Sequence, residues 1–332
     1  MNFGIIGSGS WATALAKILT DNNNTIHWWI RNCDTICHME QRRHNPHYLS
    51  SAYFNTSLLR LNEDIEEVIK ASDVLVIAVP SAFIESAFEA LPADIFKDKK
   101  VVSAIKGILP SCNDLLNDYL SKKFNIKLSD YFTVLGPCHA EEVASEKLSY
   151  LTFSGMDEEM AAQIAKYFHT EYLNTVINHD VIGVQYAAVL KNIYALGAGI
   201  AHGLEYGDNF LSVYIANAAN EMVSFLQKIV GNGICSRVNY TSSVYLGDLL
   251  VTCYSLYSRN RTFGNMLGKG YSVQSAQLEL NMVAEGFNAS KCIFKTNEIV
   301  GAKMPIAKTV YEILWLHLPP IAGFKKIENI LV

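Results

Sequence analysis

A lysine in an apolar helical stretch is well placed in this sequence for acid–base chemistry. Residues 182–198 have a helical pattern, and Lys191-Asn192 lies there among small apolar residues such as Ala187 and Ala188. Burial would lower the pKa of Lys191 towards the range in which an amine gives and takes protons near neutral pH. The alternative is a lysine at the helix edge whose ammonium group reaches water.

Further polar residues follow in the second half of the chain. Four of them recur at intervals of three or four residues: Asp248, Thr252, Ser255 and Arg259. They would share one face of a continuous helix, but that helix would separate Asp248 from Arg259 by about 16 Å, which is long for one small substrate. We therefore expect the helix to break near Tyr257, so that the planar guanidinium of Arg259 folds back to bind phosphate oxygens.

The start of the chain has the pattern of an anion-binding turn. After the short apolar run 1–6, Gly7 permits a sharp turn and Gly9 lets phosphate groups reach the backbone. Ala12 is small enough for a helix and a strand to pack closely, and apolar residues then recur at helical spacing. This order of strand, turn and helix predicts a dinucleotide site at the helix N-terminus, and the alternative is an ordinary tight turn.

Two basic residues stand at the ends of predicted strands, where ligands collect in parallel sheets. Arg31 follows the strand 25–30, and an arginine at that place accommodates the 2′-phosphate of NADP, so Arg31 favours NADPH over NADH. The alternative is a solvated arginine. Lys106 follows the strand 100–105 and is a candidate for binding substrate phosphate or carbonyl, the alternative being a surface lysine before a loop.

The elements that would position these residues change character near residue 180. Strands are predicted at 1–6, 25–30, 74–79, 100–105, 132–135, 150–153 and 174–177, and helices at 63–70, 82–91 and 157–168. This alternation predicts an α/β fold with a doubly wound parallel sheet, a Rossmann domain, over residues 1–180. Long helical patterns then take over, so we predict an all-α substrate domain over residues 181–332.

The composition is that of a globular protein. The 332 residues are 50% hydrophobic, with a mean hydropathy of +0.14 and a formal net charge of −5. The scattered basic residues predict no nucleic-acid surface, and no apolar run approaches the roughly 18 residues of a membrane span, so we expect a cytoplasmic protein. Seven cysteines without a CxxC pair argue against a disulfide framework.

Two cysteine-containing segments offer other chemistry. Five potential metal ligands crowd one stretch, Cys33, Cys37, His38, His44 and His47, but their spacing differs from that of structural zinc sites, so we expect no metal. Cys138-His139 could be a thiol nucleophile and its base, but sequence neighbours on a loop rarely face each other. We instead expect Gly136, Cys138 and Ala140 to shape the backbone around a nicotinamide.

Motifs spread over nearly the whole chain together resemble one enzyme family. In order they are Gly7-Ser8-Gly9-Ser10-Trp11, Lys106-Gly107, the loop 136–143, Leu190-Lys191-Asn192, Gly247-Asp248-Leu249 with Ser258-Arg259-Asn260-Arg261, and Val283-Ala284-Glu285-Gly286. This set resembles the bacterial-type NAD(P)-dependent glycerol-3-phosphate dehydrogenases. The resemblance implies an oxidoreductase that transfers hydride reversibly between NAD(P)H and dihydroxyacetone phosphate, giving sn-glycerol 3-phosphate for phospholipid synthesis, and it implies a homodimer.

The resemblance also implies roles for individual residues. Cofactor contacts fall on Ser10, Trp11, Arg31, Lys106, Ala140, Arg259, Val283 and Glu285, beside Gly7 and Gly9. Substrate contacts fall on Lys106, Gly136, Cys138, Lys191, Asp248, Ser258, Arg259 and Asn260, and the neighbouring Asn192 and Thr252 complete the candidate site. The proton-transfer lysine of the family falls on Lys191, which Asp248 would hold.

Two segments depart from the family's usual pattern, and two other functions compete. Cys138-His139 stands where Ser-Phe is usual, and the segment 214–222 lacks the usual Thr-Arg-Gly, so packing or subunit contacts would differ there. One competing function is a ketopantoate- or 3-hydroxyacid-type reductase of the same plan, whose substrate carries a carboxylate. The other is a dinucleotide sensor without catalysis.

Overall fold

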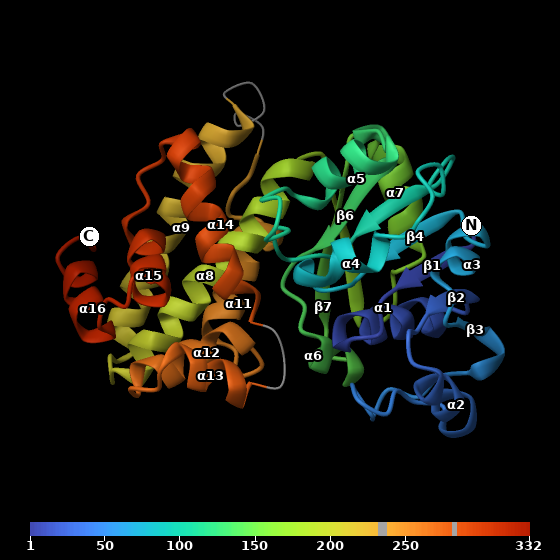
Figure 1. The fold of residues 1–332 in the computed structure, drawn as a ribbon, viewed down its shortest axis with the longest axis horizontal. Coiled ribbons are helices and arrows are strands. Elements are labelled where there is room, and N and C mark those ends of the chain that lie inside the picture. The colour runs from blue at the N-terminus through green and yellow to red at the C-terminus, as the bar shows by residue number, and fades with distance from the viewer. Residues whose placement is uncertain (232–237, 281–283) are drawn as a thin grey trace. The chain divides into compact units, whose positions relative to one another are not determined.

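The computed structural model describes residues 1–231, 238–280 and 284–332 (Figure 1). These residues form two compact units, which we describe separately. The first unit contains Met1–Ile105 and Asp114–Val181, and the second contains Lys106–Asn113 and Ile182–Val332. The sequence analysis placed the segment 106–113 in the first domain, whereas the structure groups it with the helices of the second unit.

An eight-stranded sheet forms the core of the first unit (Figure 1). Its strands are β1 (Phe3–Ile6), β2 (Ile26–Trp29), β3 (Leu59–Asn62), β4 (Val74–Ile77), β5 (Lys100–Ser103), β6 (Tyr131–Leu135), β7 (Ser149–Gly155) and β8 (Leu173–Asn178). Their order in space is β3-β2-β1-β4-β5-β6-β7-β8. β1 and β4 are buried along their whole length, as in strands covered on both faces. The predicted doubly wound sheet is confirmed.

One pair of strands departs from the parallel arrangement. β6 and β7 are antiparallel, whereas the other neighbouring strands of this described sheet are parallel. The only helix between β6 and β7 is α6 (Ala140–Ala144), which has five residues. A helix of that size is about 7.5 Å long and β6 is about 17 Å long, so the connection is too short to return the chain to the start of a parallel neighbour.

Other α-helices of the first unit connect its strands. They are α1 (Ser10–Asp21), α2 (Cys33–Arg42), α3 (Ile65–Lys70), α4 (Ile84–Phe88), α5 (Leu116–Phe124) and α7 (Glu158–Lys166). Among them, α1, α3 and α7 pack directly against the sheet. α1 is buried over almost its entire length, which agrees with its strong apolar periodicity. The sequence analysis missed α2 because only Thr35 and Met39 of that helix are buried, and it missed the edge strand β3, of which only Leu59 is buried.

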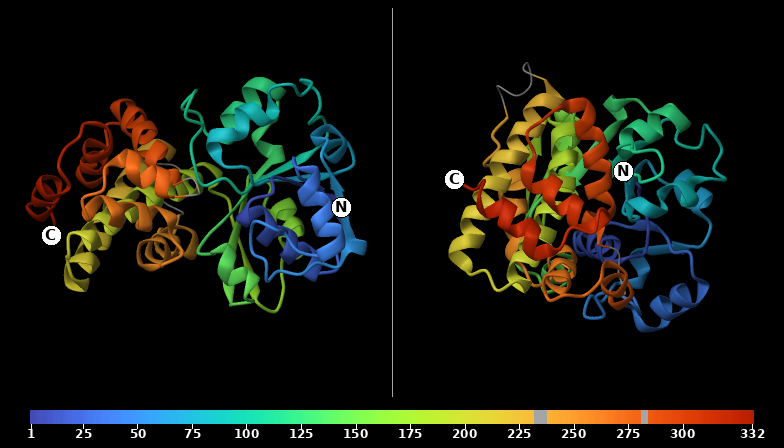
Figure 2. Two further views of the ribbon diagram at one scale, coloured as in Figure 1. Left: turned by 60° about the horizontal axis from the view of Figure 1, so that its bottom comes forward. Right: turned by 60° about the vertical axis from the view of Figure 1, so that its left-hand side comes forward.

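The described part of the second unit is helical. Its helices are α8 (Val181–Gly203), α9 (Asp208–Val230), α11 (Asp248–Tyr254), α12 (Arg259–Gly268), α13 (Val273–Glu279), α14 (Glu285–Val300), α15 (Pro305–Trp315) and α16 (Pro320–Glu328), with a π-helical turn at Ser243–Gly247. α8 contacts α9, α11, α12 and α15, whereas α16 packs against α15 at the outside of the unit (Figures 1 and 2). α8 and α12 lie so close that a Cβ atom on Gly199 would come within 2.0 Å of the Arg261 carbonyl oxygen.

Within the described residues, α8 is also the one helix that is long and apolar enough to cross a membrane. Its most apolar window has a mean hydropathy of 1.2, and 89% of that window is buried, as in the core helix of a soluble protein. In the sequence this helix is not an unbroken apolar run, because Gln185 and Lys191 interrupt it. Both side chains are buried.

Candidate functional site

The turn between β1 and α1 has the geometry of an anion cradle. Gly7 has a φ of +123°, and a Cβ atom there would lie 2.8 Å from the Ala78 carbonyl oxygen, so only glycine fits. Gly9 is the N-cap of α1 and has an ordinary backbone conformation. A Cβ atom on Gly9 would meet no described atom within 4 Å, so the missing side chain leaves open space where phosphate groups can approach the N-terminus of α1.

Two residues that the sequence analysis did not assign hold this turn in place. Asn45 is 1% exposed, and its amide nitrogen donates to the Ser8 carbonyl oxygen at 3.1 Å and to Thr13 Oγ1 at 3.0 Å. Trp28 Nε1 donates to the Gly7 carbonyl oxygen at 2.7 Å. An Asn-Pro dipeptide is typical of a turn, but the contact of Asn45 with the glycine loop links segments that the sequence alone does not connect.

The other predicted residues of the first unit lie near the ends of strands. Ser10 and Trp11 begin α1, and Arg31 is exposed just after β2. Gly136 follows β6 with a φ of +138°, where a side chain would strike the Tyr150 carbonyl oxygen. Cys138 is 3% exposed and belongs to an apolar core cluster that also contains Ala140, the first residue of α6. The thiol of Cys138 therefore packs in the core.

The second unit contains a buried ion pair. Lys191 on α8 and Asp248, the first residue of α11, are 3% and 1% exposed, and Lys191 Nζ lies 2.5 Å from Asp248 Oδ1. Lys191 is therefore not a solvated lysine at a helix edge. Asp248 Oδ2 is buried and has no hydrogen-bond partner among the described residues. An unused buried acceptor of this kind is costly, and a ligand hydroxyl would satisfy it.

Side-chain amides connect this pair to three other segments of the second unit. Asn192, next to Lys191, donates to the Lys106 carbonyl oxygen at 2.9 Å, and its own side-chain oxygen accepts from Asn260 Nδ2 at 3.0 Å. Asn260 Oδ1 in turn accepts from the Gly286 backbone N–H at 2.9 Å. This chain of hydrogen bonds joins α8, α12 and the start of α14 to the segment that carries Lys106.

The predicted break in the polar helix is confirmed. α11 ends at Tyr254 and α12 begins at Arg259. Ser258 is the buried N-cap of α12, and its Oγ accepts from the Arg261 backbone N–H at 3.3 Å. Arg259 is exposed in the first turn of α12, where the helix dipole also favours an anion. Thr252 Oγ1 donates to the Asp248 carbonyl oxygen at 2.5 Å.

Two groups of residues remain. Glu285 begins α14 and is half-buried, and Val283 lies outside the described residues.

In the cysteine and histidine stretch, His38 Nε2 lies 3.5 Å from His44 Nε2. No group of three or more His, Cys, Asp or Glu side chains within the described ranges could hold a metal ion.

Comparisons with known proteins cover both units. The model of the NAD-dependent glycerol-3-phosphate dehydrogenase N-terminus matches residues 2–161, and the model of its C-terminus matches residues 180–325. The chain is 32% identical over 330 residues to glycerol-3-phosphate dehydrogenase [NAD(P)+] from Chlorobium chlorochromatii, covering 99% of this chain and 98% of the relative. It is 34% identical over 316 residues to the Bacillus subtilis protein of the same name, covering 94% and 89%.

The fold leads to the same family. The crystal structure of glycerol-3-phosphate dehydrogenase from Coxiella burnetii superimposes on this chain with a TM-score of 0.90 at 25% identity, covering 99% of this chain and 98% of that one. The matched models and this superposition both extend over the two units, and the matched ranges include all the candidate site residues. The chain therefore belongs to the NAD-dependent glycerol-3-phosphate dehydrogenase family.

Proposed function

We propose that this chain catalyses reversible hydride transfer between NAD(P)H and dihydroxyacetone phosphate, with sn-glycerol 3-phosphate as the reduced product. The observation that carries the proposal is the buried pair of Lys191 and Asp248, 2.5 Å apart, in the unit that also presents Arg259. Beside the hydride donor, the reduction of a phosphorylated ketone needs a proton donor and a cation that binds the phosphate, and Lys191 and Arg259 can supply them. Relatives that match 99% and 94% of the chain carry the name of this activity.

The first unit fits a nicotinamide dinucleotide, which supplies or accepts the hydride when it is bound. The open space beside Gly9 and the N-terminus of α1 suit the pyrophosphate. The turn at Gly136 and the residues up to Ala140 would shape the nicotinamide end of the site. Arg31 is exposed at the end of β2, as expected of a residue that meets the ribose, and we propose that it favours NADPH.

Lys191 is the proposed proton donor. Its ion pair with Asp248 favours the ammonium form, which can give a proton to the carbonyl oxygen as negative charge develops there. In the reverse direction the neutral amine takes the proton back from the alcohol. Asp248 Oδ2 is the buried acceptor left for the substrate hydroxyl, so the same carboxylate would orient both the proton donor and the substrate.

Arg259 and Lys106 are the proposed ligands of the substrate phosphate. The guanidinium of Arg259 is accessible and stands at the N-terminus of α12, so two N–H groups can bind phosphate oxygens side by side. Asn192 and Asn260 hydrogen-bond to each other and to backbone groups, which supports a role in holding Lys191, Arg259 and Lys106 at fixed positions.

The test is an initial-rate assay of dihydroxyacetone phosphate reduction with NADPH and NADH side by side. We expect turnover with both cofactors and a higher kcat/KM with NADPH. Ketopantoate and a 3-oxo acid serve as control substrates, because a carboxylate-specific reductase would prefer them. Tight binding of NADPH without turnover of any of these ketones would support the sensor function and contradict the proposal.

Other properties follow from the family and are proposed with it. We infer a cytoplasmic homodimer that makes sn-glycerol 3-phosphate for phospholipid synthesis and has no nucleic-acid partner. The net charge of −5 and the small-molecule substrates of the family support the absence of a nucleic-acid partner. Sedimentation equilibrium would give the subunit number, and a mass of one chain at micromolar concentration would contradict the homodimer.

A further inference from the structure

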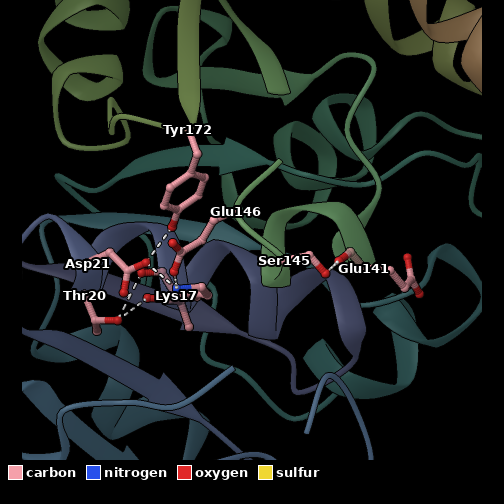
Figure 3. A network of polar contacts seen from close by, with 8 residues as sticks. Lys17, Thr20, Asp21, Glu141, Ser145, Glu146 and Tyr172 are labelled. Atoms are coloured by element: carbon pink, nitrogen blue, oxygen red, sulfur yellow. Dashed lines mark hydrogen bonds and ion pairs between the residues drawn. The ribbon is translucent and has the colours of Figure 1, made fainter. Parts of the chain in front are cut away.

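The first unit contains another buried lysine, which the proposed reaction does not use. Lys17 lies on α1, two turns beyond the anion cradle, and is 6% exposed. Its Nζ lies 2.5 Å from Asp21 Oδ2 on the same helix and 3.0 Å from Glu146 Oε1, which follows α6 (Figure 3). Tyr172 OH donates to the same oxygen of Asp21 at 2.6 Å, and its ring centre lies 5.5 Å from Lys17 Nζ.

These contacts keep Lys17 charged. Burial lowers the pKa of Lys17, but its hydrogen bonds and charge interactions with Asp21 and Glu146 outweigh burial and leave the pKa above its usual value. A buried ammonium without such partners would be strongly unfavourable. Glu146 is 129 residues away in the sequence, so this ion pair is a long-range connection and not a local feature of the helix.

The backbone at Glu146 shows that its position is specified. Glu146 has a φ of +55°, in the left-handed region that residues other than glycine rarely adopt. The turn after α6 is closed by backbone hydrogen bonds from Glu146 to Val143 at 3.0 Å and from Lys147 to Glu142 at 2.9 Å. This turn places the Glu146 carboxylate against Lys17 although 61% of the Glu146 side chain is exposed, so the buried member of the pair is the lysine, and the ion pair offsets an unfavourable backbone conformation.

The two helices joined in this way carry opposite ends of the proposed cofactor site. The N-terminus of α1, next to Gly9, is the cradle for the pyrophosphate. The N-terminus of α6, at Ala140, ends the loop that would face the nicotinamide. The spacing between these two ends must match the length of the dinucleotide, and the contacts of Lys17 with Asp21 and Glu146 fix α6 against α1.

We propose that Lys17, acting through Glu146, is a positioning residue for the dinucleotide. It sets the distance between the pyrophosphate cradle on α1 and the loop before α6, and thereby the affinity for NAD(P)H. This inference rests on the proposed function, because it concerns the cofactor site of that reaction. Loss of the contact should weaken cofactor binding and leave proton transfer in the second unit unchanged.

The experiment compares Lys17→Met with a matched control, Lys70→Met. Lys70 on α3 makes the same kind of contact within its helix, 3.2 Å from Glu66, but half of its side chain is exposed. We expect Lys17→Met to raise the Kd for NADPH, measured by fluorescence titration, and the KM for NADPH by about tenfold. The kcat at saturating NADPH and the KM for dihydroxyacetone phosphate should stay within about twofold. Lys70→Met should change none of these, and Lys17→Arg should recover part of the affinity.

A second variant separates positioning from folding. Glu146→Gly removes the carboxylate but suits the left-handed backbone, and Lys17 keeps Asp21 as its partner, so the relief of backbone strain should offset the lost ion pair and the melting temperature should stay close to that of the wild type. Its Kd for NADPH should rise in the same direction as that of Lys17→Met. If both variants bind NADPH as tightly as the wild type, the inference is wrong, although the proposed function stands. If Lys17→Met does not fold, the same result for Glu146→Gly alone has the same meaning. Wild-type protein that neither binds NADPH nor reduces dihydroxyacetone phosphate would overturn both.

Discussion

The two units each contain a buried lysine, and the acids that face these lysines differ. In the sheet unit, Lys17 contacts Asp21 and Glu146, and the Asp21 oxygen that it contacts also accepts from Tyr172. In the helical unit, Lys191 contacts Asp248 Oδ1, while Asp248 Oδ2 is buried without a hydrogen-bond partner among the described residues. The first group is satisfied by the protein itself, whereas the second keeps an acceptor available.

This difference separates a structural group from a group prepared for a ligand. A buried cation whose partners are all in place holds the segments that it joins, because moving them apart would leave that cation unpaired in the core. A buried acceptor that the protein does not use costs free energy, and such groups persist at sites where a substrate completes them. The contrast therefore supports a positioning role for Lys17 and a catalytic role for Lys191.

The largest expected effect is on catalysis at Lys191. Lys191→Ala should lower kcat by 10²-fold or more, with an upper range of about 10⁴-fold, because the alkoxide loses its proton donor. The variant leaves Asp248 buried without its cation, so its stability should also fall, by about 3–5 kcal/mol. A double variant, Lys191→Met with Asp248→Asn, should recover stability but not activity. A kcat for Lys191→Ala close to that of the wild type would remove Lys191 from this role.

A third buried charged group, Glu221 on α9, shows what happens without a cation. Its oxygens accept from the backbone N–H groups of Ile306 and Ala307, both at 2.8 Å, and from Tyr194 OH at 3.2 Å. Burial nevertheless raises the pKa of Glu221 to about 7 from its usual value of 4.5. The folded protein then holds a proton that the unfolded chain has lost, so this contribution to stability is complete below pH 4.5 and disappears as the pH rises through 7.

The loss for Glu221 should be on the order of 3 kcal/mol across that range. Urea denaturation at pH values from 5 to 8 measures it, by comparison with Glu221→Gln. The variant should be less stable at low pH, because the amide nitrogen cannot accept from a backbone N–H group, but its stability should change less with pH. Parallel pH curves for the two proteins would show that Glu221 does not titrate in this range.

A substitution at Arg259 should have a smaller effect than one at Lys191 or Glu221, and it should change only the KM for dihydroxyacetone phosphate. Arg259→Lys keeps the positive charge but replaces the two-point contact with a single ammonium group, so the KM for dihydroxyacetone phosphate should rise by about tenfold. The kcat should change little, because Lys191 and Asp248 are untouched. Lys70→Met, on the first unit, is the control. An unchanged KM would show that the substrate phosphate binds elsewhere. A fall of kcat and kcat/KM by the same factor would show that Arg259 acts mainly in the transition state.

The sequence predicted those parts of the structure that depend on local pattern. The turn at Gly7 and Gly9 and the buried strand β4 follow from residue types at short spacing, whereas the break before Arg259 was predicted from the length that a continuous helix would have. Contacts between distant segments could not be predicted in this way. Nothing in the spacing of Lys17 and Glu146 indicates that they meet, and nothing in the sequence indicates the hydrogen bonds of the segment 106–113 to Asn192 and Thr296 of the helical unit.

The smallest expected effect is at Arg31, which sharpens the contrast between buried and exposed cations in the sheet unit. Arg31 is exposed, so water and salt screen its contact with a 2′-phosphate, and Arg31→Ser should raise the KM for NADPH by only about fivefold. The KM for NADH should not change, because NADH lacks that phosphate. Raising the ionic strength should weaken NADPH binding to the wild type more than to the variant, whereas the effect of Lys17→Met should persist at high salt because Lys17 is buried. Equal changes in the KM values for both cofactors would show that Arg31 supports the fold of the site and does not select NADPH.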